Sequence, residues 1–189
     1  VPVTETICVG GSASEFSVSY TKGLGTPSYQ WYSNTVYSNT GGTPIFGAVS
    51  DTYQPVIFTS TGTYYYYVEV SLDGVGCTSS NSDVYEVEVV ADPVIDSEPI
   101  STQSLCVGGT AIDLSVSISG GVASSMNYQW YSNTLNSNTG GDVIVGASAS
   151  SYTPASNQEG TFYYYAVVRQ SASDCSVVSS VSELKVIAI

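Results

Sequence analysis

The feature that most constrains the fold is a string of residues that occurs twice. Tyr-Gln-Trp-Tyr-Ser-Asn-Thr occupies residues 29–35 and again 128–134, and in each copy Ser-Asn-Thr-Gly-Gly follows after two further residues. Cys-Val-Gly-Gly lies before both copies, and a Gly-Thr run rich in tyrosine lies after both. Corresponding landmarks are 98 or 99 residues apart, since 106 − 8 is 98 and 130 − 31 is 99. The chain is therefore two copies of one domain, as in tandem-repeat proteins.

Each copy shows the pattern of short strands joined by turns. Residues 15–20 alternate apolar with polar side chains, and the equivalent segment of the second copy does the same, which predicts a half-buried strand. Turn residues recur about every 8 to 12 positions, and no segment has helical periodicity. At roughly 95 residues, each copy has the size of an immunoglobulin domain. The sequence predicts an all-β fold of two tandem immunoglobulin-like antiparallel β-sandwiches. The apolar residues of the two segments are Phe16, Val18 and Tyr20, and Leu114, Val116 and Ile118.

Proline and acidic residues mark the boundary between the copies. Asp92 and Pro93 follow the last predicted strand of the first copy, residues 84–90, and Pro99 lies just beyond. Short segments that contain proline are stiff connectors. We therefore predict domain 1 over residues 1–91, a linker over residues 92–98 and domain 2 over residues 99–189.

Two aromatic residues in each copy are predicted to anchor the core. Trp31 and Trp130 stand in the third strand, where an immunoglobulin-like domain carries its core tryptophan. Tyr66 and Tyr164 stand in the sixth strand, in the place of that fold's second cysteine. We expect all four side chains to point inward.

The same comparison predicts a difference between the copies. Tyr64 has the position of the corner tyrosine, whose hydroxyl bonds back to the chain a few residues upstream. The second copy has Phe162 there, which lacks the hydroxyl. We expect the corner hydrogen bond only in the first copy.

The four cysteines are spaced equally in the two copies. Cys8 and Cys77 are 69 residues apart, and so are Cys106 and Cys175 (77 − 8 and 175 − 106). This spacing favours one disulfide inside each domain, Cys8 with Cys77 and Cys106 with Cys175, over the other two pairings that four cysteines allow. Four reduced, buried thiols are the alternative. Paired cysteines indicate an oxidising compartment outside the cytosol.

Composition argues against several classes of function. The 16 acidic and 3 basic residues give a net charge of −13, which repels nucleic-acid phosphates and anionic lipids. There is no histidine, the commonest general base and metal ligand. Asp51, a candidate for carboxylate catalysis, aligns with Ser150. No apolar run reaches the length of a membrane span. We expect no enzyme activity, no nucleic-acid partner and no membrane insertion.

Tyrosines on the outward faces of neighbouring strands form a candidate binding strip. Aromatic rings in such a row could stack on sugar rings. The alternative is that cross-strand tyrosines only stabilise an exposed sheet, by roughly 0.2 to 1 kcal/mol per pair. The strip comprises Tyr32, Tyr65 and Tyr67 in the first domain and Tyr131, Tyr163 and Tyr165 in the second.

Three acidic residues cluster at the domain junction. Asp92, Asp96 and Glu98 offer the carboxylate oxygens that calcium prefers, and an ion there would stiffen the linker. Their spacing matches no known calcium loop, and a solvated acidic linker is the alternative. We predict no cofactor, with calcium at the linker as the candidate ion.

The ordered landmarks resemble one family. Cys-Val-Gly-Gly, the tryptophan string, Ser-Asn-Thr-Gly-Gly, Gly-Thr-Tyr-Tyr-Tyr and a final cysteine are similar to the Ig-like repeats of very large Bacteroidetes surface proteins. Many of those proteins are exported by the type IX system, and some are flavobacterial gliding adhesins. The resemblance covers nearly the whole chain, twice. It implies a tandem array that holds a distal adhesive part away from the cell, and it transfers no catalytic residue.

These observations lead to one functional prediction and one alternative. We expect a non-catalytic stalk or spacer repeat of a large adhesin, outside the cell at its surface, involved in surface adhesion or gliding motility. Its expected partners are neighbouring repeats of the same long chain, and surface glycans or other surface proteins. The alternative is a carbohydrate-binding module that uses the outward-facing tyrosines.

Overall fold

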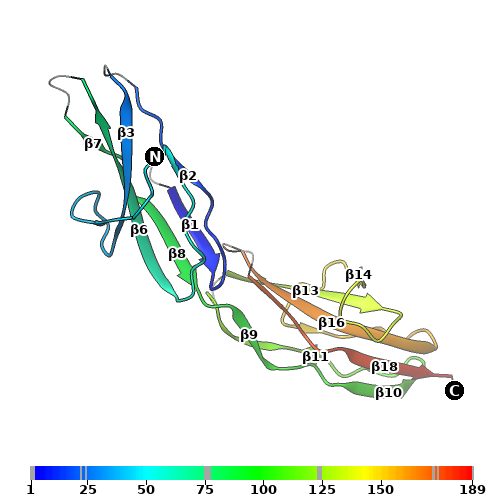
Figure 1. Cartoon of the computed structure of the whole chain (residues 1–189). Helices are drawn as coiled ribbons and strands as arrows, with labels where there is room; N and C mark the ends of the chain where they lie inside the picture. Colours follow the sequence, from blue (N-terminus) through cyan, green and yellow to red (C-terminus); the bar gives the residue numbers. More distant parts are fainter. Residues whose placement is uncertain are drawn as a thin grey trace. The chain divides into compact units, whose positions relative to one another are not determined.

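The computed structural model describes residues 3–21, 23, 25–74, 78–122, 125–171, 173 and 175–188 (Figure 1). These residues form strands and no α-helix, which confirms the predicted all-β class. None of them belongs to a helix that could cross a membrane. The chain divides into two compact units, Val1–Val90 and Ala91–Ile189.

The first unit packs one large sheet against one small sheet. The large sheet has the order β1, β8, β6, β3, β4, with β7 also paired to β6, and the small sheet pairs β2 with β5. Its strands are β1 (Val3–Cys8), β2 (Phe16–Ser17), β3 (Pro27–Asn34), β4 (Thr43–Pro44), β5 (Thr52–Tyr53), β6 (Gly62–Leu72), β7 (Ser80–Asn81) and β8 (Tyr85–Val90).

The second unit repeats this topology and adds one strand pair. Its large sheet has the order β10, β18, β16, β13, β14, with β17 paired to β16, and β11 pairs with β15. The added pair is β9 with β12. Its strands are β9 (Pro93–Ser97), β10 (Thr102–Cys106), β11 (Leu114–Ser115), β12 (Ser117–Gly120), β13 (Met126–Asn133), β14 (Asp142–Val143), β15 (Ser151–Tyr152), β16 (Gly160–Gln170), β17 (Ser176–Val178) and β18 (Ser182–Ile187).

The first strand of each large sheet runs parallel to the last. β1 pairs with β8 from Val3 opposite Tyr85 to Cys8 opposite Val90, and β10 pairs with β18 in the same way. The other strand pairs among the described residues are antiparallel. β1 was not predicted from the sequence, although Thr4, Thr6 and Ile7 are residue types that favour strands.

The segment predicted as a linker contains a strand. Residues 93–97 of the segment 92–98 form β9, which lies antiparallel to β12 within the second unit. Two features explain the strand: Val94 and Ile95 favour extended backbone, and proline is tolerated as the first residue of a strand. The second compact unit accordingly begins at Ala91, before the predicted boundary at residue 99.

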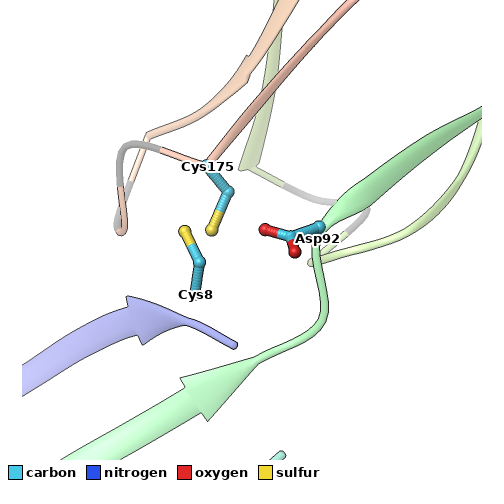
Figure 2. A group of neighbouring side chains, drawn as sticks. All are labelled: Cys8, Asp92 and Cys175. Atoms are coloured by element: carbon cyan, nitrogen blue, oxygen red, sulfur yellow. The ribbon is translucent and has the colours of Figure 1, made fainter. Parts of the chain in front are cut away.

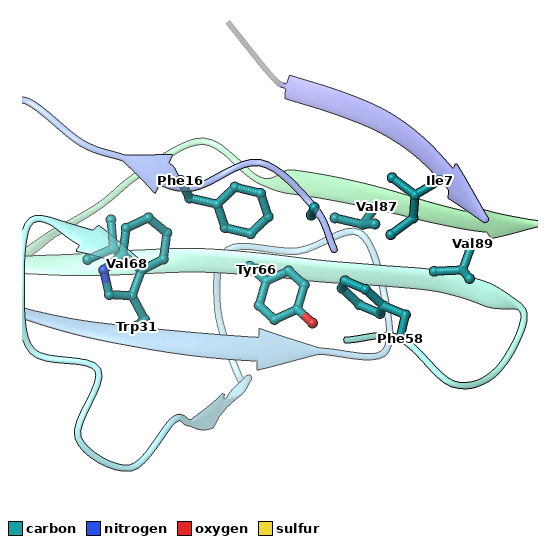
Figure 3. Packing of buried hydrophobic residues seen from close by; sticks show 9 residues of the cluster. Ile7, Phe16, Trp31, Phe58, Tyr66, Val68, Val87 and Val89 are labelled. Carbon is teal, nitrogen blue, oxygen red and sulfur yellow. The ribbon is translucent and has the colours of Figure 1, made fainter. Parts of the chain in front are cut away.

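The core of each unit surrounds a tryptophan. Trp31 and Trp130 are 0 % exposed, and Tyr66 and Tyr164 are buried beside them. In the first unit the ring of Phe16 lies 5.4 Å from that of Tyr66, so the small sheet packs on the large one through aromatic contacts (Figure 3). Burial of so many large side chains is the main favourable contribution to the stability of each unit.

The strand predicted over residues 15–20 is shorter than expected. Only Phe16–Ser17 pairs, with β5, and Tyr20 is 42 % exposed. In the second unit the equivalent segment continues into β12, and Ile118 is partly buried against the core.

The predicted corner hydrogen bond is present in the first unit. The hydroxyl of Tyr64 donates to the backbone oxygen of Ser60 at 3.1 Å. Phe162 packs against the core of the second unit without a hydroxyl group.

Candidate functional site

Three side chains of the repeated string, those of Gln30, Trp31 and Asn34, donate hydrogen bonds inside their own unit. Gln30 Nε2 donates to the backbone oxygens of Trp31 and Ile45, both at 2.9 Å. The indole nitrogen of Trp31 donates to Ser50 O at 2.9 Å. Asn34 Nδ2 donates to two backbone oxygens of the following loop. The string therefore closes the hairpin after β3 and satisfies the buried polar groups near the tryptophan.

The second unit repeats these contacts at the same positions. Gln129 Nε2 donates to Trp130 O and Ile144 O, and Trp130 Nε1 donates to Ala149 O at 3.0 Å. Asn133 Nδ2 donates to the loop as Asn34 does. Because both copies use the same bonds, the string specifies architecture in each.

The two tyrosines on the outer face of each large sheet stack on one another. Tyr32 and Tyr67 have ring centroids 4.9 Å apart and an interplanar angle of 3°. Tyr131 and Tyr165 repeat the stack at 5.1 Å and 5°. The hydroxyl of Tyr67 accepts a bond from the backbone N–H of Gly42, so a hairpin covers the ring.

The predicted sugar-binding strip is therefore wrong in one respect. Tyr67 and Tyr165 are each only 3 % exposed, since their rings lie under the Gly-Gly turn of the preceding hairpin. A buried ring face is not available to stack on a sugar. The other four members, Tyr32, Tyr65, Tyr131 and Tyr163, are partly buried.

A polar groove lies beside the tyrosine stack of the first unit. It has a volume of about 650 Å³ and lies between the hairpin at residues 39–42 and residues 79–81. Tyr32 donates its hydroxyl proton to Glu69 Oε2 at 3.0 Å within this groove. The bond to the carboxylate is the largest cause of the raised pKa of Tyr32, and burial is the next. In the second unit Val167 takes the place of Glu69 in the register, so the groove chemistry is not repeated.

Glu69 is a groove residue that was not predicted from the sequence. Glu69 follows the tyrosine run in β6, and its counterpart in the second copy is the apolar Val167. Because the two copies differ at this position, it is not among the residues that they share.

Two buried tyrosines have strongly shifted acidity. Burial raises the pKa of Tyr66 to about 12, with smaller contributions from Tyr53 and Tyr64. Burial also raises the pKa of Tyr164 to about 12, with a smaller contribution from Tyr152. Both groups stay neutral at physiological pH, as core residues should.

The cysteine geometry of the second unit excludes one predicted disulfide. Cys106 ends β10 beside Ile187 of β18, and this end of β18 also pairs with Gly160, the first residue of β16. The backbone oxygen of Cys175 accepts a bond from Gln170, the last residue of β16. The two cysteines thus lie at opposite ends of a strand about 33 Å long, whereas a disulfide requires Cα atoms within about 7 Å.

The states of the cysteines agree with that geometry. Cys106 is an exposed free thiol, whereas Cys8 and Cys175 are disulfide-bonded. The predicted pairing of Cys106 with Cys175 is therefore wrong. Cys77, the predicted partner of Cys8, lies outside the described residues. Figure 2 draws Cys8 at the end of β1, Asp92 before β9 and Cys175 before β17.

The acidic residues near β9 bond to protein donors. Asp96 Oδ1 accepts a bond from Ser119 Oγ at 2.6 Å, and Glu98 Oε2 accepts a bond from the backbone N–H of Ser180 at 2.8 Å. Asp92 is exposed. Calcium at this segment stays a prediction, and Asp96 and Glu98 already have roles in holding β9 to its own unit.

Two solved structures are similar to the whole chain in fold. The fibronectin(III)-like modules of Clostridium thermocellum CbhA share 14 % identity at a TM-score of 0.55, covering 99 % of this chain and 91 % of that one. An I-band fragment of titin shares 17 % identity at a TM-score of 0.52, covering 99 % of this chain and 64 % of that one. The chain therefore has the fold of two tandem immunoglobulin-like or fibronectin type III-like domains, and the first of these folds is the one that the sequence predicted.

A family model also matches both halves. The chain belongs to the family described as a domain of unknown function (DUF8696), which matches residues 1–91 and again residues 98–188. A comparison with curated proteins finds no match.

Proposed function

We propose that this chain is a pair of spacer repeats from a large extracellular surface protein, without catalytic activity of its own. The resemblance to the Ig-like repeats of Bacteroidetes surface proteins supports the setting, an array exported to the cell surface that serves adhesion or gliding. Domains of the immunoglobulin and fibronectin kind are in general structural modules. Neighbouring repeats of the same chain are then the first partners of each unit.

The observation that carries the proposal is the parallel pairing of the first and last strands, in chain order, of each large sheet. In the first unit β1 is the first strand and β8 the last, and the two run parallel over six residue pairs. Tension applied at the two ends of the unit pulls β1 and β8 in opposite directions along their common axis. The ladder bonds then carry the force together, whereas an antiparallel terminal hairpin would open one bond at a time.

The second unit has the same arrangement. β10 and β18 are parallel over five pairs, and Val107 N donates to Ile187 O at 2.9 Å just beyond them, as Val9 N donates to Val90 O at 3.1 Å. Both units therefore have a topology that resists extension, which supports a spacer function under tension.

Pulling the 189-residue chain from its two ends in single-molecule force spectroscopy tests the proposal. We expect two unfolding events of comparable force. Ile7→Pro should lower the unfolding force of the first unit alone, because it removes an N–H of the β1 ladder. Alternate residues of a parallel strand face the partner, and Val9 donates to β8, so Ile7 is on the bonding side.

Thr6→Pro is the matched control, since the amide of Thr6 points away from β8 by the same alternation. Its unfolding force should stay closer to that of the unmodified unit. If the unmodified units unfolded at forces no higher than the Ile7→Pro unit, the role in bearing tension would be wrong.

The polar groove of the first unit keeps the carbohydrate-binding alternative open for that unit. Tyr32 is partly buried there, and Glu69, Asn39 and Asn81 offer polar atoms that sugars commonly bond. A glycan array probed with the chain and with Tyr32→Ala decides between the two functions. Saturable binding that Tyr32→Ala abolishes would establish the alternative, and we expect none.

A further inference from the structure

A second groove of the first unit lies along an edge of the small sheet. It has a volume of about 320 Å³, and its walls come from the segment after β2 and from the strands β6 and β7. Both apolar side chains and hydroxyl groups line it. Principal lining residues are Val18, Ser19, Tyr20, Thr21, Val70 and Ser80.

The equivalent place in the second unit is filled by β9. This strand pairs with β12, where Ile95 lies opposite Ile118, and it also packs on β16 and β17. The offset of 98 residues makes Ser117, Ile118 and Ser119 the counterparts of Ser19, Tyr20 and Thr21.

The wall of the groove that β6 and β7 form also has a counterpart in the second unit, formed by β16 and β17. Val70 is the counterpart of Val168 by the same offset, and it pairs with Ser80 as Val168 pairs with Val177. The three segments that surround β9 in the second unit are thus the three that form this groove in the first.

The edge of the groove offers unpaired backbone. Among the described residues, no strand pairs with Ser19, Tyr20 or Thr21, and Tyr20 is 42 % exposed, whereas Ile118 packs on its core. Unpaired N–H and C=O groups at a sheet edge are a template for one more strand.

The side chains that fix β9 have counterparts as well. Ser119 Oγ donates to Asp96 at 2.6 Å, and the hydroxyl groups of Ser117 and Ser97 lie 2.7 Å apart. Ser19 and Thr21 place a hydroxyl at each of the two corresponding positions of the first unit. A strand with the sequence of β9 would therefore find the same two polar contacts there.

We propose that this groove is the acceptor for one extended strand with the character of residues 91–98, which the first unit binds by β-strand addition. The strand adds backbone pairing with residues 19–21, buries its isoleucine against Tyr20 and directs its aspartate to Thr21. The inference rests on the proposed function only for the origin of the strand, since in an array the segment that leads into a repeat supplies it.

Fusing a second copy of residues 91–98 directly before Val1 tests the proposal on the full chain. The offset of 98 places Val1 opposite Pro99, so the added copy joins in the register that β9 has with its own unit. We expect hydrogen exchange at the amides of residues 19–21 to slow at least about tenfold, as new ladder bonds protect them. The melting temperature of the first unit should rise by about 4 to 8 °C.

Two variants serve as controls. The same fusion with Val94→Pro and Ile95→Pro in the added copy removes two N–H groups and should give neither protection nor a rise in melting temperature. Thr21→Ala, at an exposed position that leaves the unit folded, should lessen the rise. Equal exchange at residues 19–21 in the fusion and its proline control would overturn the proposal. This readout is independent of the pulling experiment, so failure of the spacer function and failure of the strand acceptor are distinguishable.

Discussion

The two units share their core and differ at their edges. The tryptophan string makes the same hydrogen bonds in both, and the outer tyrosine stack is reproduced to within 0.2 Å in ring separation, 4.9 Å against 5.1 Å. The differences are the corner residue, the Glu69 position and the strand β9. The duplicated string therefore specifies the architecture, and these three differences lie where a unit meets solvent or another segment.

The largest expected effect tests whether the cores are equivalent. Trp31→Ala and Trp130→Ala should each destabilise their own unit by about 3 to 5 kcal/mol, because each removes a fully buried ring and an indole hydrogen bond. Calorimetry of the two variants measures the loss in each unit. Val36→Ala, at an exposed position, is the control and should change little. A loss confined to one unit would break the equivalence.

A smaller effect is expected at the glycine that covers the tyrosine stack. A Cβ on Gly42 would lie 2.7 Å from Ser33 O and 2.9 Å from a ring carbon of Tyr67, and Gly141 has matching distances of 2.6 and 3.0 Å. Gly42→Ala and Gly141→Ala should therefore each cost about 1 to 3 kcal/mol through overpacking. Urea unfolding followed by tryptophan fluorescence measures the cost. Thr43→Ala in the same hairpin should be nearly neutral, and a neutral Gly42→Ala would show that the hairpin can move off the ring.

A still smaller effect is expected from the corner hydrogen bond, which only the first unit has. Tyr64→Phe should cost the first unit about 0.5 to 1.5 kcal/mol, since it removes the bond to Ser60 O and keeps the ring. Phe162→Tyr should increase the stability of the second unit by part of the same amount. Thermal unfolding of both variants measures the changes. If Tyr64→Phe changed nothing, the corner bond would have no net value in this exposed position.

The duplication made the core residues predictable from the sequence, but it gave no information on the strands at the edges of the sheets. Trp31 and Tyr66 were placed inward because alternation and duplication agree at those positions. The sequence predicts a linker over residues 92–98 because three acids and Pro93, with Pro99 just beyond, suggest a connector. The two apolar residues of β9 are too few to show alternation. Only pairing with β12, which lies about twenty residues further along the chain, makes it a strand.

The cysteines show a second limit of spacing arguments. Equal separations of 69 residues in both copies prove that the positions are equivalent. They do not show that the two positions are close, because β16 carries the chain the full length of the sheet between them. The tyrosine strip failed in part for a similar reason: strand alternation gives the face of Tyr67, but only the hairpin geometry shows that Gly42 covers it.

The smallest effect appears only in alkali. The pKa of Tyr66 and that of Tyr164 are both raised from 10.0 to about 12, chiefly by burial. A raised pKa in the folded state contributes stability that is fully present below pH 10.0 and is lost as the pH rises toward about 12. Neutral pH should therefore leave both units unaffected, and alkaline unfolding should begin in this window. Tyr66→Phe and Tyr164→Phe should each weaken the pH dependence of their own unit, measured by unfolding and by the ultraviolet absorbance of tyrosinate. The neighbours of the two tyrosines differ, Tyr53 and Tyr64 in one unit and Tyr152 in the other. Equal effects would thus show that burial in the shared core sets the acidity, whereas a clear excess in the first unit would assign part of it to Tyr64 at the corner.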